Sequence, residues 1–122
     1  MSPASGDPAE ALVELVCFRV GSEEYVVDVG RVREVVAPPP IRRMPRIPDF
    51  LEGVVDLRGE VVPVIDARRR FGLQAGTPTR KTKLMVVKVG GAPLGLVVDA
   101  VNEVLRVPRS AIRPAPALAG RD

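Results

Sequence analysis

The sequence contains no histidine and no tryptophan, a single cysteine, and only 3% aromatic residues. Without histidine it has no Ser–His or Cys–His pair, and it shows neither a glycine-rich phosphate loop nor residues at metal-ligand spacing. These absences argue against an enzyme. We therefore expect no catalytic residue, no bound metal and no cofactor.

The sequence also lacks a second cysteine and a long hydrophobic run. No stretch approaches the roughly 20 apolar residues that span a bilayer, so we expect no direct membrane insertion. One cysteine, Cys17, cannot form an intramolecular disulfide, which suits a reducing cytoplasm. Cys17 alternates with Phe18 in a predicted strand, and no histidine could activate it. We interpret Cys17 as a small core hydrophobe.

A strong charge of one sign is missing as well, because 18 basic residues face 15 acidic ones and the formal charge is +3. Two arginine clusters, at 42–46 and 68–70, are the most basic segments. The aromatic residues that could stack on bases are expected inside the fold: Phe18, Tyr25, Phe50 and Phe71. We predict solvated basic faces and no nucleic-acid partner. A basic SH3-like RNA-binding module is a weaker alternative, which loss of binding at high salt would reveal.

What the sequence has is aliphatic side chains and turn residues. Hydrophobic residues make up 46%, chiefly valine and leucine, and thirteen prolines and eleven glycines interrupt them. Valine is stiff and favours strands, so the composition predicts an all-β fold of short strands and many turns.

Three hairpins are predicted, and the central one turns at Gly59 and buries Val64. The expected strands are 12–20 with 25–29, 53–58 with 61–66, and 83–89 with 94–99. Residues 67–71 are expected to form one helical turn that ends at Gly72.

The two halves of the chain resemble each other. Residues 14–36 (ELVCFRVGSEEYVVDVGRVREVV) and 83–105 (KLMVVKVGGAPLGLVVDAVNEVL) share Val-Gly turns, a Val-Val-Asp strand end and a Glu-Val pair. Chance similarity between valine-rich strands is the alternative.

The duplication predicts a complete β-module at 11–73, a linker at 74–82 and an incomplete module at 83–118. Residues 1–10 are small and polar and are interpreted as a disordered leader, and residues 119–122 as a tail. The incomplete copy should expose an open sheet edge and exchange amide protons at 83–112 faster than at 53–66.

Four aspartates mark strand ends and invite a metal or acid–base interpretation: Asp28, Asp56, Asp66 and Asp99. Asp28 and Asp99 occupy equivalent places in the repeat. We interpret them as acceptors for turn amides rather than as a metal or catalytic site.

Several motifs together carry a family resemblance. They are an FxxGxxxY opening at 18–25, a VxEV element at 32–35, the run EGVVDLRGEVVPVIDARRRFGL at 52–73, GLVVDAVNEVL at 95–105 and IRPAP at 112–116. Over residues 12–118 the chain resembles the CheW-like domain of bacterial chemotaxis. The resemblance implies a pair of small SH3-like β-barrels, of which the second is truncated at the C-terminus. A short CheW-like protein of the Frizzy (FrzB-type) gliding-motility system would look like this.

The resemblance also implies a function. CheW-like adaptors are cytoplasmic and non-catalytic, are recruited to receptor arrays, and bind the cytoplasmic tip of chemoreceptors together with a CheA-type histidine kinase or another CheW-like protein. The alternative is a receptor-side competitor that does not bind the kinase.

The resemblance points to seven candidate partner-binding residues: Val32, Glu34, Gly53, Arg58, Gly59, Gly95 and Asp99. The Arg58 guanidinium would pair with a receptor carboxylate or brace a groove, or else it is a solvated turn residue. Val32 and Glu34 would present an apolar contact with a charged rim, or else Val32 packs in the core. For Gly53 and Gly59, backbone geometry is the stronger explanation.

Overall fold

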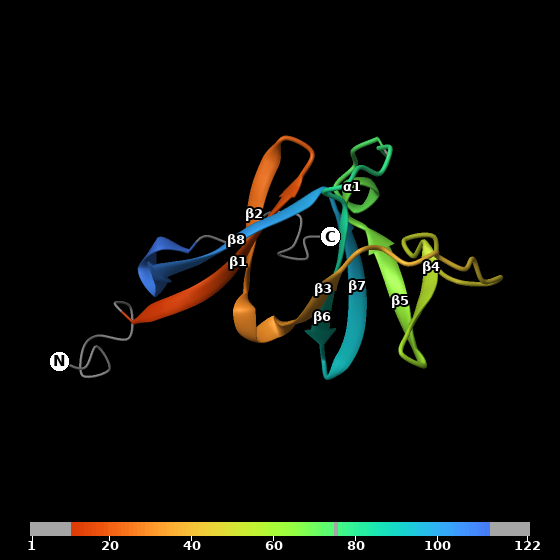
Figure 1. Cartoon of the computed structure of the whole chain (residues 1–122), viewed down its shortest axis with the longest axis horizontal. Coiled ribbons are helices and arrows are strands. Elements are labelled where there is room, and N and C mark those ends of the chain that lie inside the picture. The colour runs from red at the N-terminus through yellow and green to blue at the C-terminus, as the bar shows by residue number, and fades with distance from the viewer. Residues whose placement is uncertain (1–10, 75, 113–122) are drawn as a thin grey trace.

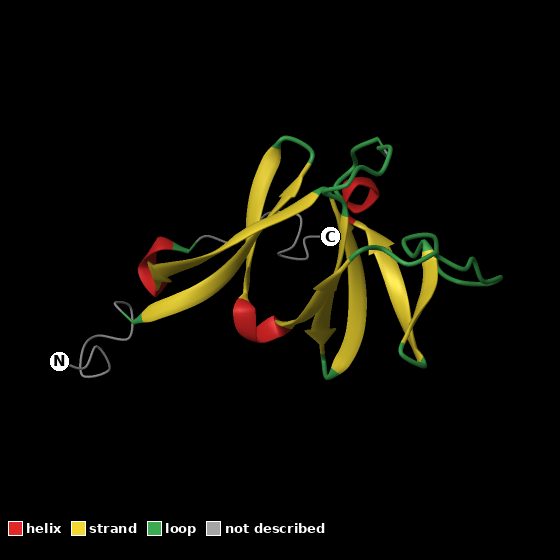
Figure 2. Cartoon of the chain, viewed as in Figure 1, coloured by secondary structure: helices red, strands yellow, loops and turns green. Residues whose placement is uncertain are grey.

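Residues 11–74 and 76–112 are described by a computed structural model, and strands make up most of them (Figure 1; Figure 2). The strands are β1 (Leu12–Val20), β2 (Glu23–Asp28), β3 (Val32–Val36), β4 (Gly53–Leu57), β5 (Glu60–Asp66), β6 (Lys83–Val89), β7 (Ala92–Val98) and β8 (Ala100–Pro108). One short helix, α1 (Ala67–Arg70), and two 3-10 turns, η3 (Val29–Arg31) and η4 (Arg109–Ala111), connect or follow them. The all-β class is confirmed.

The strands form two sheets. A three-stranded sheet has the order β2-β1-β8, and a five-stranded sheet has the order β3-β6-β7-β5-β4. Every pairing is antiparallel except that between β5 and β7. Figure 2 shows the two sheets side by side, with the loop between β3 and β4 on the outer side of the five-stranded sheet.

The five-stranded sheet curls so that the loop following its edge strand β3 meets its other edge strand, β4. The loop after β3 forms a bridge to β4, in which the Arg42 amide donates to the Val54 carbonyl and the Val54 amide donates to the Arg42 carbonyl, at 2.7 and 2.9 Å. This closure produces the barrel expected for an SH3-like unit. The expected pair of units is thus a closed barrel packed against a smaller sheet.

The strand pairing differs from the predicted modules, because both sheets combine strands from the two sides of the 74–82 linker. β6 and β7 lie inside the five-stranded sheet, while β8 joins β1 and β2. The edges of the smaller sheet, within the described residues, are β2 and β8 rather than the hairpin at 83–99. The difference arises from long-range pairing, above all the parallel contact of β5 with β7, which a comparison of sequence repeats does not reveal.

The core has two parts, and β6 belongs to both. Its Leu84 and Val86 point into the barrel, where they meet residues such as Val62 and Val64. Its Met85 and Val87 point the other way, toward the smaller sheet. A strand that is buried on both faces needs an unbroken apolar run, which explains the sequence LMVV.

The second part of the core joins the sheets. β1 contributes Val16, Phe18 and Val20 to it, and the rings of Tyr25 and Phe71 pack around them. Cys17 is buried, and burial raises the pKa of its thiol. The interpretation of Cys17 as a core residue is confirmed.

The predicted hairpins agree with the structure to within two residues at each strand end. Gly72 follows α1 with a φ of 81°, as a residue that ends a helix does. The sequence pattern assigns no strand to residues 32–36 or 100–108, where the structure places β3 and β8. Neither segment belongs to one of the three glycine-turn hairpins by which the other strands are recognised.

Some predictions fall outside the described residues: the leader at 1–10, the tail at 119–122, and residues 113–118 of the second module. None of the helices within 11–74 and 76–112 has the length and hydropathy of a membrane-spanning segment.

Candidate functional site

Two of the candidate residues, Arg58 and Glu34, are in direct contact. Arg58 lies in the turn between β4 and β5, and Glu34 lies on β3 at the other edge of the sheet. Curling of the sheet brings them together, and one terminal Arg58 nitrogen donates to both Glu34 carboxylate oxygens, at 2.8 and 2.6 Å. The ion pair therefore braces the seam of the barrel.

The backbone at Arg58 is unusual. Arg58 and Gly59 are the two central residues of a hairpin turn, and their φ values are 50° and 84°. A two-residue turn with both φ positive is most readily made by Asn-Gly or Gly-Gly. Arginine at the first position costs roughly 1 kcal/mol of backbone strain. Such strain persists only where surrounding contacts hold it, and the ion pair with Glu34 is one of these contacts.

Two further charges complete a cluster that we call the seam cluster: Arg33, Glu34, Arg58 and Glu60. Arg33 donates to Glu60 at 2.5 Å and lies 3.5 Å from Glu34. The hydrogen bond from Arg58 holds the pKa of Glu34 below its usual range, and the hydrogen bond from Arg33 does the same for Glu60. Both carboxylates therefore stay charged at neutral pH.

The seam cluster combines an exposed arginine with a largely shielded glutamate. The Arg58 side chain is 69% exposed, whereas that of Glu34 is 17% exposed. Val35 and Val61, next to the two acids in sequence, are also exposed, but neighbouring residues of a strand point to opposite faces. The cluster thus presents an exposed guanidinium, with which a carboxylate can pair.

Sequence reasoning missed Arg33 and Glu60. The signal that could have found them is charge order, since Arg33-Glu34 on β3 and Arg58-Gly59-Glu60 in the turn present opposite charges in pairs. This charge order predicts the ion pairs only once the β4–β5 turn is known to lie beside β3.

Val32 is partly buried and packs against the core that joins the two sheets. The structure therefore favours the core interpretation of this side chain. Its place at the start of β3, two residues before Glu34, keeps it within the same element.

The candidate glycines have backbone roles. A Cβ on Gly53 would lie 2.2 Å from the Arg42 carbonyl oxygen, at the bridge that closes the barrel. A Cβ on Gly95, in the middle of β7, would lie 2.8 Å from the Leu84 side chain. Gly59 has open space around it and serves the turn through its positive φ. Two of the three glycines thus permit close packing, and the third permits the turn.

Asp99 lies away from the seam cluster, at the junction of β7 and β8. Its carboxylate accepts hydrogen bonds from the Gly21 amide at 2.6 Å and from Arg68 at 3.0 Å. These contacts tie the β1–β2 turn of the smaller sheet to helix α1, which follows strand β5 of the five-stranded sheet. Asp99 is a joint between the sheets, so the candidate residues do not form one patch.

The expectation for the other aspartates holds in part. Asp28 accepts from the Gly30 amide and Asp66 accepts from the Arg68 amide, both in the turns that follow their strands. Asp56 instead pairs with Arg42. Within residues 11–74 and 76–112 no three metal-binding side chains gather.

Phe50 is the one aromatic residue for which the sequence expectation is wrong. It is 57% exposed, in the loop between β3 and β4, while Phe18 is buried and Tyr25 and Phe71 are partly buried. That loop lies on the outer side of the barrel (Figure 2), away from both core clusters.

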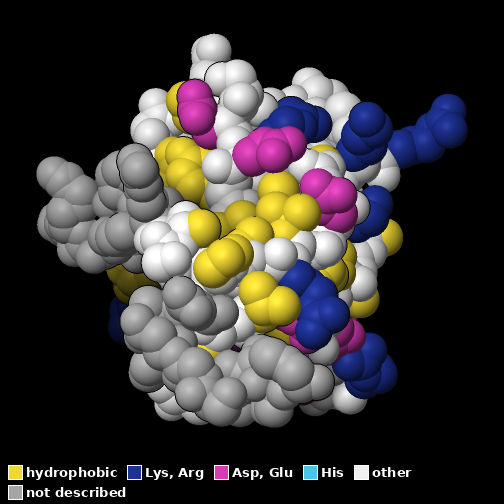
Figure 3. Space-filling model, turned by 90° about the vertical axis from the view of Figure 1, so that its left-hand side faces the viewer, with side chains coloured by type: hydrophobic (Ala, Val, Ile, Leu, Met, Phe, Trp, Pro, Cys, Tyr) yellow, Lys and Arg dark blue, Asp and Glu magenta, His cyan; other side chains and the backbone are white. Residues whose placement is uncertain are grey.

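A second surface lies on the smaller sheet. Figure 3 faces the side on which β1 and β8 lie, and hydrophobic side chains gather there among acidic and basic ones. The exposed hydrophobic residues of this sheet include Leu12 and Val104. Exposed apolar surface of this kind is a candidate interaction site.

Comparison with known proteins places this geometry in a family. Residues 14–122 match the CheW-like domain. The chain is 40% identical over 106 residues to "Chemotaxis protein CheW" of Rhizobium meliloti (strain 1021), covering 87% of this chain and 68% of the relative. It is 36% identical over 103 residues to "Protein FrzA" of Myxococcus xanthus, covering 84% of this chain and 64% of the relative. The chain thus spans about two thirds of the length of these relatives.

A solved structure agrees with the sequence matches. The "scaffolding protein TtCheW" of Thermoanaerobacter tengcongensis superimposes with a TM-score of 0.79 and 36% identity, covering 87% of this chain and 73% of that one. The likeness therefore extends to the three-dimensional arrangement of the two sheets.

Proposed function

The chain belongs to the family of CheW-like domains, and we propose on that premise that it binds the cytoplasmic tip of chemoreceptors and couples them to a CheA-type histidine kinase. The family consists of non-catalytic chemotaxis scaffold proteins, so the chain is a scaffold and not an enzyme. The observation that carries the proposal is the match of residues 14–122, nearly the whole chain, to that family.

The arrangement of the surfaces supports an adaptor. A protein that couples two partners needs two separate contact surfaces. One is the seam cluster with its exposed arginine, and the other is the apolar side of the smaller sheet (Figure 3). Because they belong to different sheets, both can be occupied at once.

The seam cluster is the better candidate for a specific contact. Among the described residues its Arg58 pairs with Glu34 through one terminal nitrogen, and it is held in a strained turn. Arginines are typical of interface residues on which affinity depends. We assign the receptor contact to this cluster.

A pulldown tests the proposal: the chain is incubated with a chemoreceptor cytoplasmic fragment and with a CheA-type kinase, each alone and then together. Binding to both is expected. Binding to the receptor alone would replace the adaptor with a receptor-side competitor. Binding to neither would overturn the proposal.

Arg58→Asn separates binding from folding at the seam cluster. Asparagine relieves the backbone strain of this turn but loses the pair with Glu34. The two effects are of similar size and oppose each other, so the variant should melt within a few degrees of the wild type. It lacks the guanidinium, so its affinity for the receptor fragment should fall about tenfold. The matched control is Arg106→Ala, at an exposed arginine on β8 that lies 3.8 Å from Glu14. Unchanged affinity in Arg58→Asn would remove Arg58 from the receptor site.

The same proposal covers localisation. Since the scaffold binds receptors, it is expected at receptor arrays, and Arg58→Asn should disperse a fluorescent fusion from receptor clusters while Arg106→Ala should not.

A further inference from the structure

The loop between β3 and β4 and the helix α1 enclose a hollow that the proposed function does not use. It has a volume of about 150 Å³ and is lined by Asp49, Phe50, Glu52, Arg69 and Arg70. α1 follows β5 at the end opposite the Arg58 turn. Seven residues of β5 separate the two places, or about 23 Å of strand. The hollow is thus distinct from the seam cluster.

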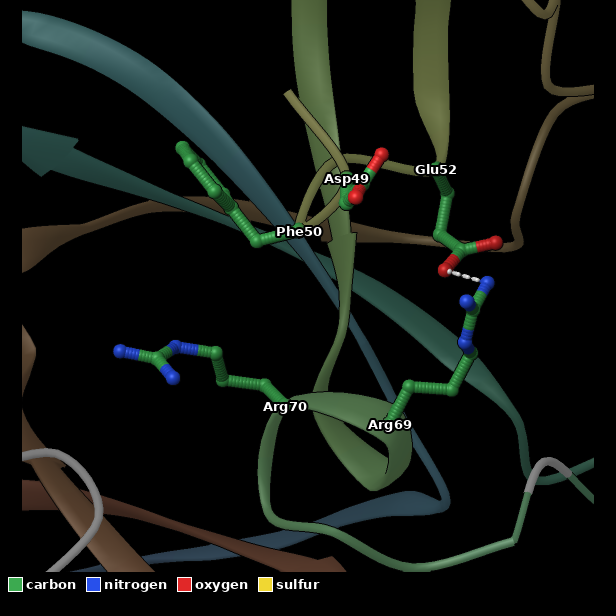
Figure 4. A pocket seen from close by; sticks show the side chains of 5 residues that line it. All are labelled: Asp49, Phe50, Glu52, Arg69 and Arg70. Carbon is green, nitrogen blue, oxygen red and sulfur yellow. Dashed lines mark hydrogen bonds and ion pairs between the residues drawn. The ribbon is translucent and has the colours of Figure 1, made fainter. Parts of the chain in front are cut away.

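Figure 4 shows that the lining residues come from the loop and from α1. Arg69 donates to the Glu52 carboxylate, which ties α1 to the loop. Away from this pair, Phe50 and Arg70 extend in the same direction, from the loop and from the helix respectively. Both residues are exposed. An aromatic ring and a guanidinium therefore flank one opening.

The surroundings are positively charged. A larger hollow of about 470 Å³ adjoins the first, shares Asp49 and Arg69 with it, and adds Arg43 and Arg46 to its lining. Across both hollows four arginines face two carboxylates, and one of these carboxylates is neutralised by Arg69. In the part of the chain that the structure describes, Arg43, Arg46 and Arg70 have no ion-pair partner.

We propose that this hollow docks an acidic peptide segment of a partner protein. A carboxylate of the segment pairs with the free Arg70 guanidinium, and the apolar side chain beside that carboxylate packs on the Phe50 ring. Arginine binds carboxylates through two parallel hydrogen bonds, which gives such a contact direction as well as strength. Arg43 and Arg46 attract further acidic residues of the same segment.

Two features favour a peptide over a nucleic acid. A single ring offers one stacking place, whereas single-stranded nucleic acid is bound by successive rings along a basic groove. Moreover, Asp49 lies in both hollows, where it would repel a continuous phosphate backbone, while a peptide can place its acidic and apolar residues on either side of it.

The test uses the full chain and a short fluorescent peptide of alternating leucine and glutamate. Titration followed by amide chemical shifts should move the resonances of residues 43–52 and 67–71, and leave those of the β4–β5 turn in place. A peptide with glutamine in place of glutamate should bind at least about tenfold more weakly.

Two variants give the residue-level test. Arg70→Glu should lower the peptide affinity about tenfold, and Phe50→Ala should lower it several-fold. Arg106→Glu changes the net charge by the same amount as Arg70→Glu, but on the other sheet, and should have a much smaller effect. Because Phe50, Arg70 and Arg106 are all exposed, the three variants should melt like the wild type.

Three outcomes would overturn the proposal: equal losses in Arg70→Glu and Arg106→Glu, shifts confined to another surface, or tighter binding of an oligouridine than of the acidic peptide. The receptor pulldown is independent of this result. Arg70→Glu should still bind the receptor fragment, so failure of the peptide site and failure of the adaptor proposal are distinguishable.

Discussion

Glu34 and Arg58 illustrate how much one contact depends on the surroundings of both side chains. The carboxylate is mostly shielded on β3, and the guanidinium reaches it from a turn on the far edge of the sheet. Because the hydrogen bond from Arg58 favours the charged form, the pKa of Glu34 is lowered. The stabilisation from this pair is therefore present above the pKa of an unfolded glutamate, about 4.3, and is lost as the pH falls through the lower folded value.

A titration of the Glu34 side-chain carboxyl by carbon NMR checks this effect. In the wild type the midpoint should lie below the usual glutamate range. In Arg58→Asn it should move upward, because the main cause of the shift has been removed. An unchanged midpoint would show that the pair does not persist in solution.

Gly53 and Gly59 both have positive φ, yet they should respond differently to substitution. Gly59→Ala meets no neighbouring atom and should cost roughly 1 kcal/mol for the left-handed backbone. Gly53→Ala would place a methyl group against the Arg42 carbonyl, whose hydrogen bond closes the barrel. We expect a loss on the order of 3 kcal/mol. Chemical denaturation of the two variants compares them, and equal losses would contradict the close approach at Gly53.

At the scale of elements, β5 shows how one strand combines a buried and an open face. Val62 and Val64 are fully buried in the barrel core, whereas Val61 is 53% exposed. The sequence predicts the burial of Val64 from its place in the central hairpin, and the structure confirms it. Alternation along a strand that has one face in the core is enough for this inference.

Val64→Asp should therefore unfold the barrel, since it buries an unpaired charge at a cost of more than about 3 kcal/mol. Val61→Lys, three residues earlier on the same strand and opposite Asp56, is the control and should leave the melting temperature nearly unchanged. Thermal unfolding followed by circular dichroism measures both. Similar melting curves for Val64→Asp and wild type would place Val64 outside the core.

At the scale of the whole molecule, protection from solvent should follow the sheet order and not the repeat. β6 and β7 are each flanked by strands on both sides, whereas β2 is an edge of the smaller sheet within the described residues. Amides of β6 and β7 should thus exchange more slowly than those of β2. Hydrogen exchange followed by NMR tests the order. Faster exchange of the amides at 83–98 than of those at 23–28 would instead support the division into modules that the sequence repeat predicts.

The sequence by itself determined the all-β class, the three hairpins, the burial of Cys17 and Val64, and the family. These depend on local properties: valine-rich alternation, glycine turns, and motifs such as LRG that are contiguous in the chain. Each can be recognised without knowing which distant residues meet.

Only the tertiary structure decided that β8 completes the sheet of β1, that Glu34 meets Arg58, that Asp99 joins the two sheets, and that Phe50 faces solvent beside Arg70. The contact of Glu34 with Arg58 joins residues that are 24 positions apart, and the contact of Gly21 with Asp99 joins residues that are 78 positions apart. Strand pairing over such separations is selected by the packing of the whole core, and no local pattern encodes it.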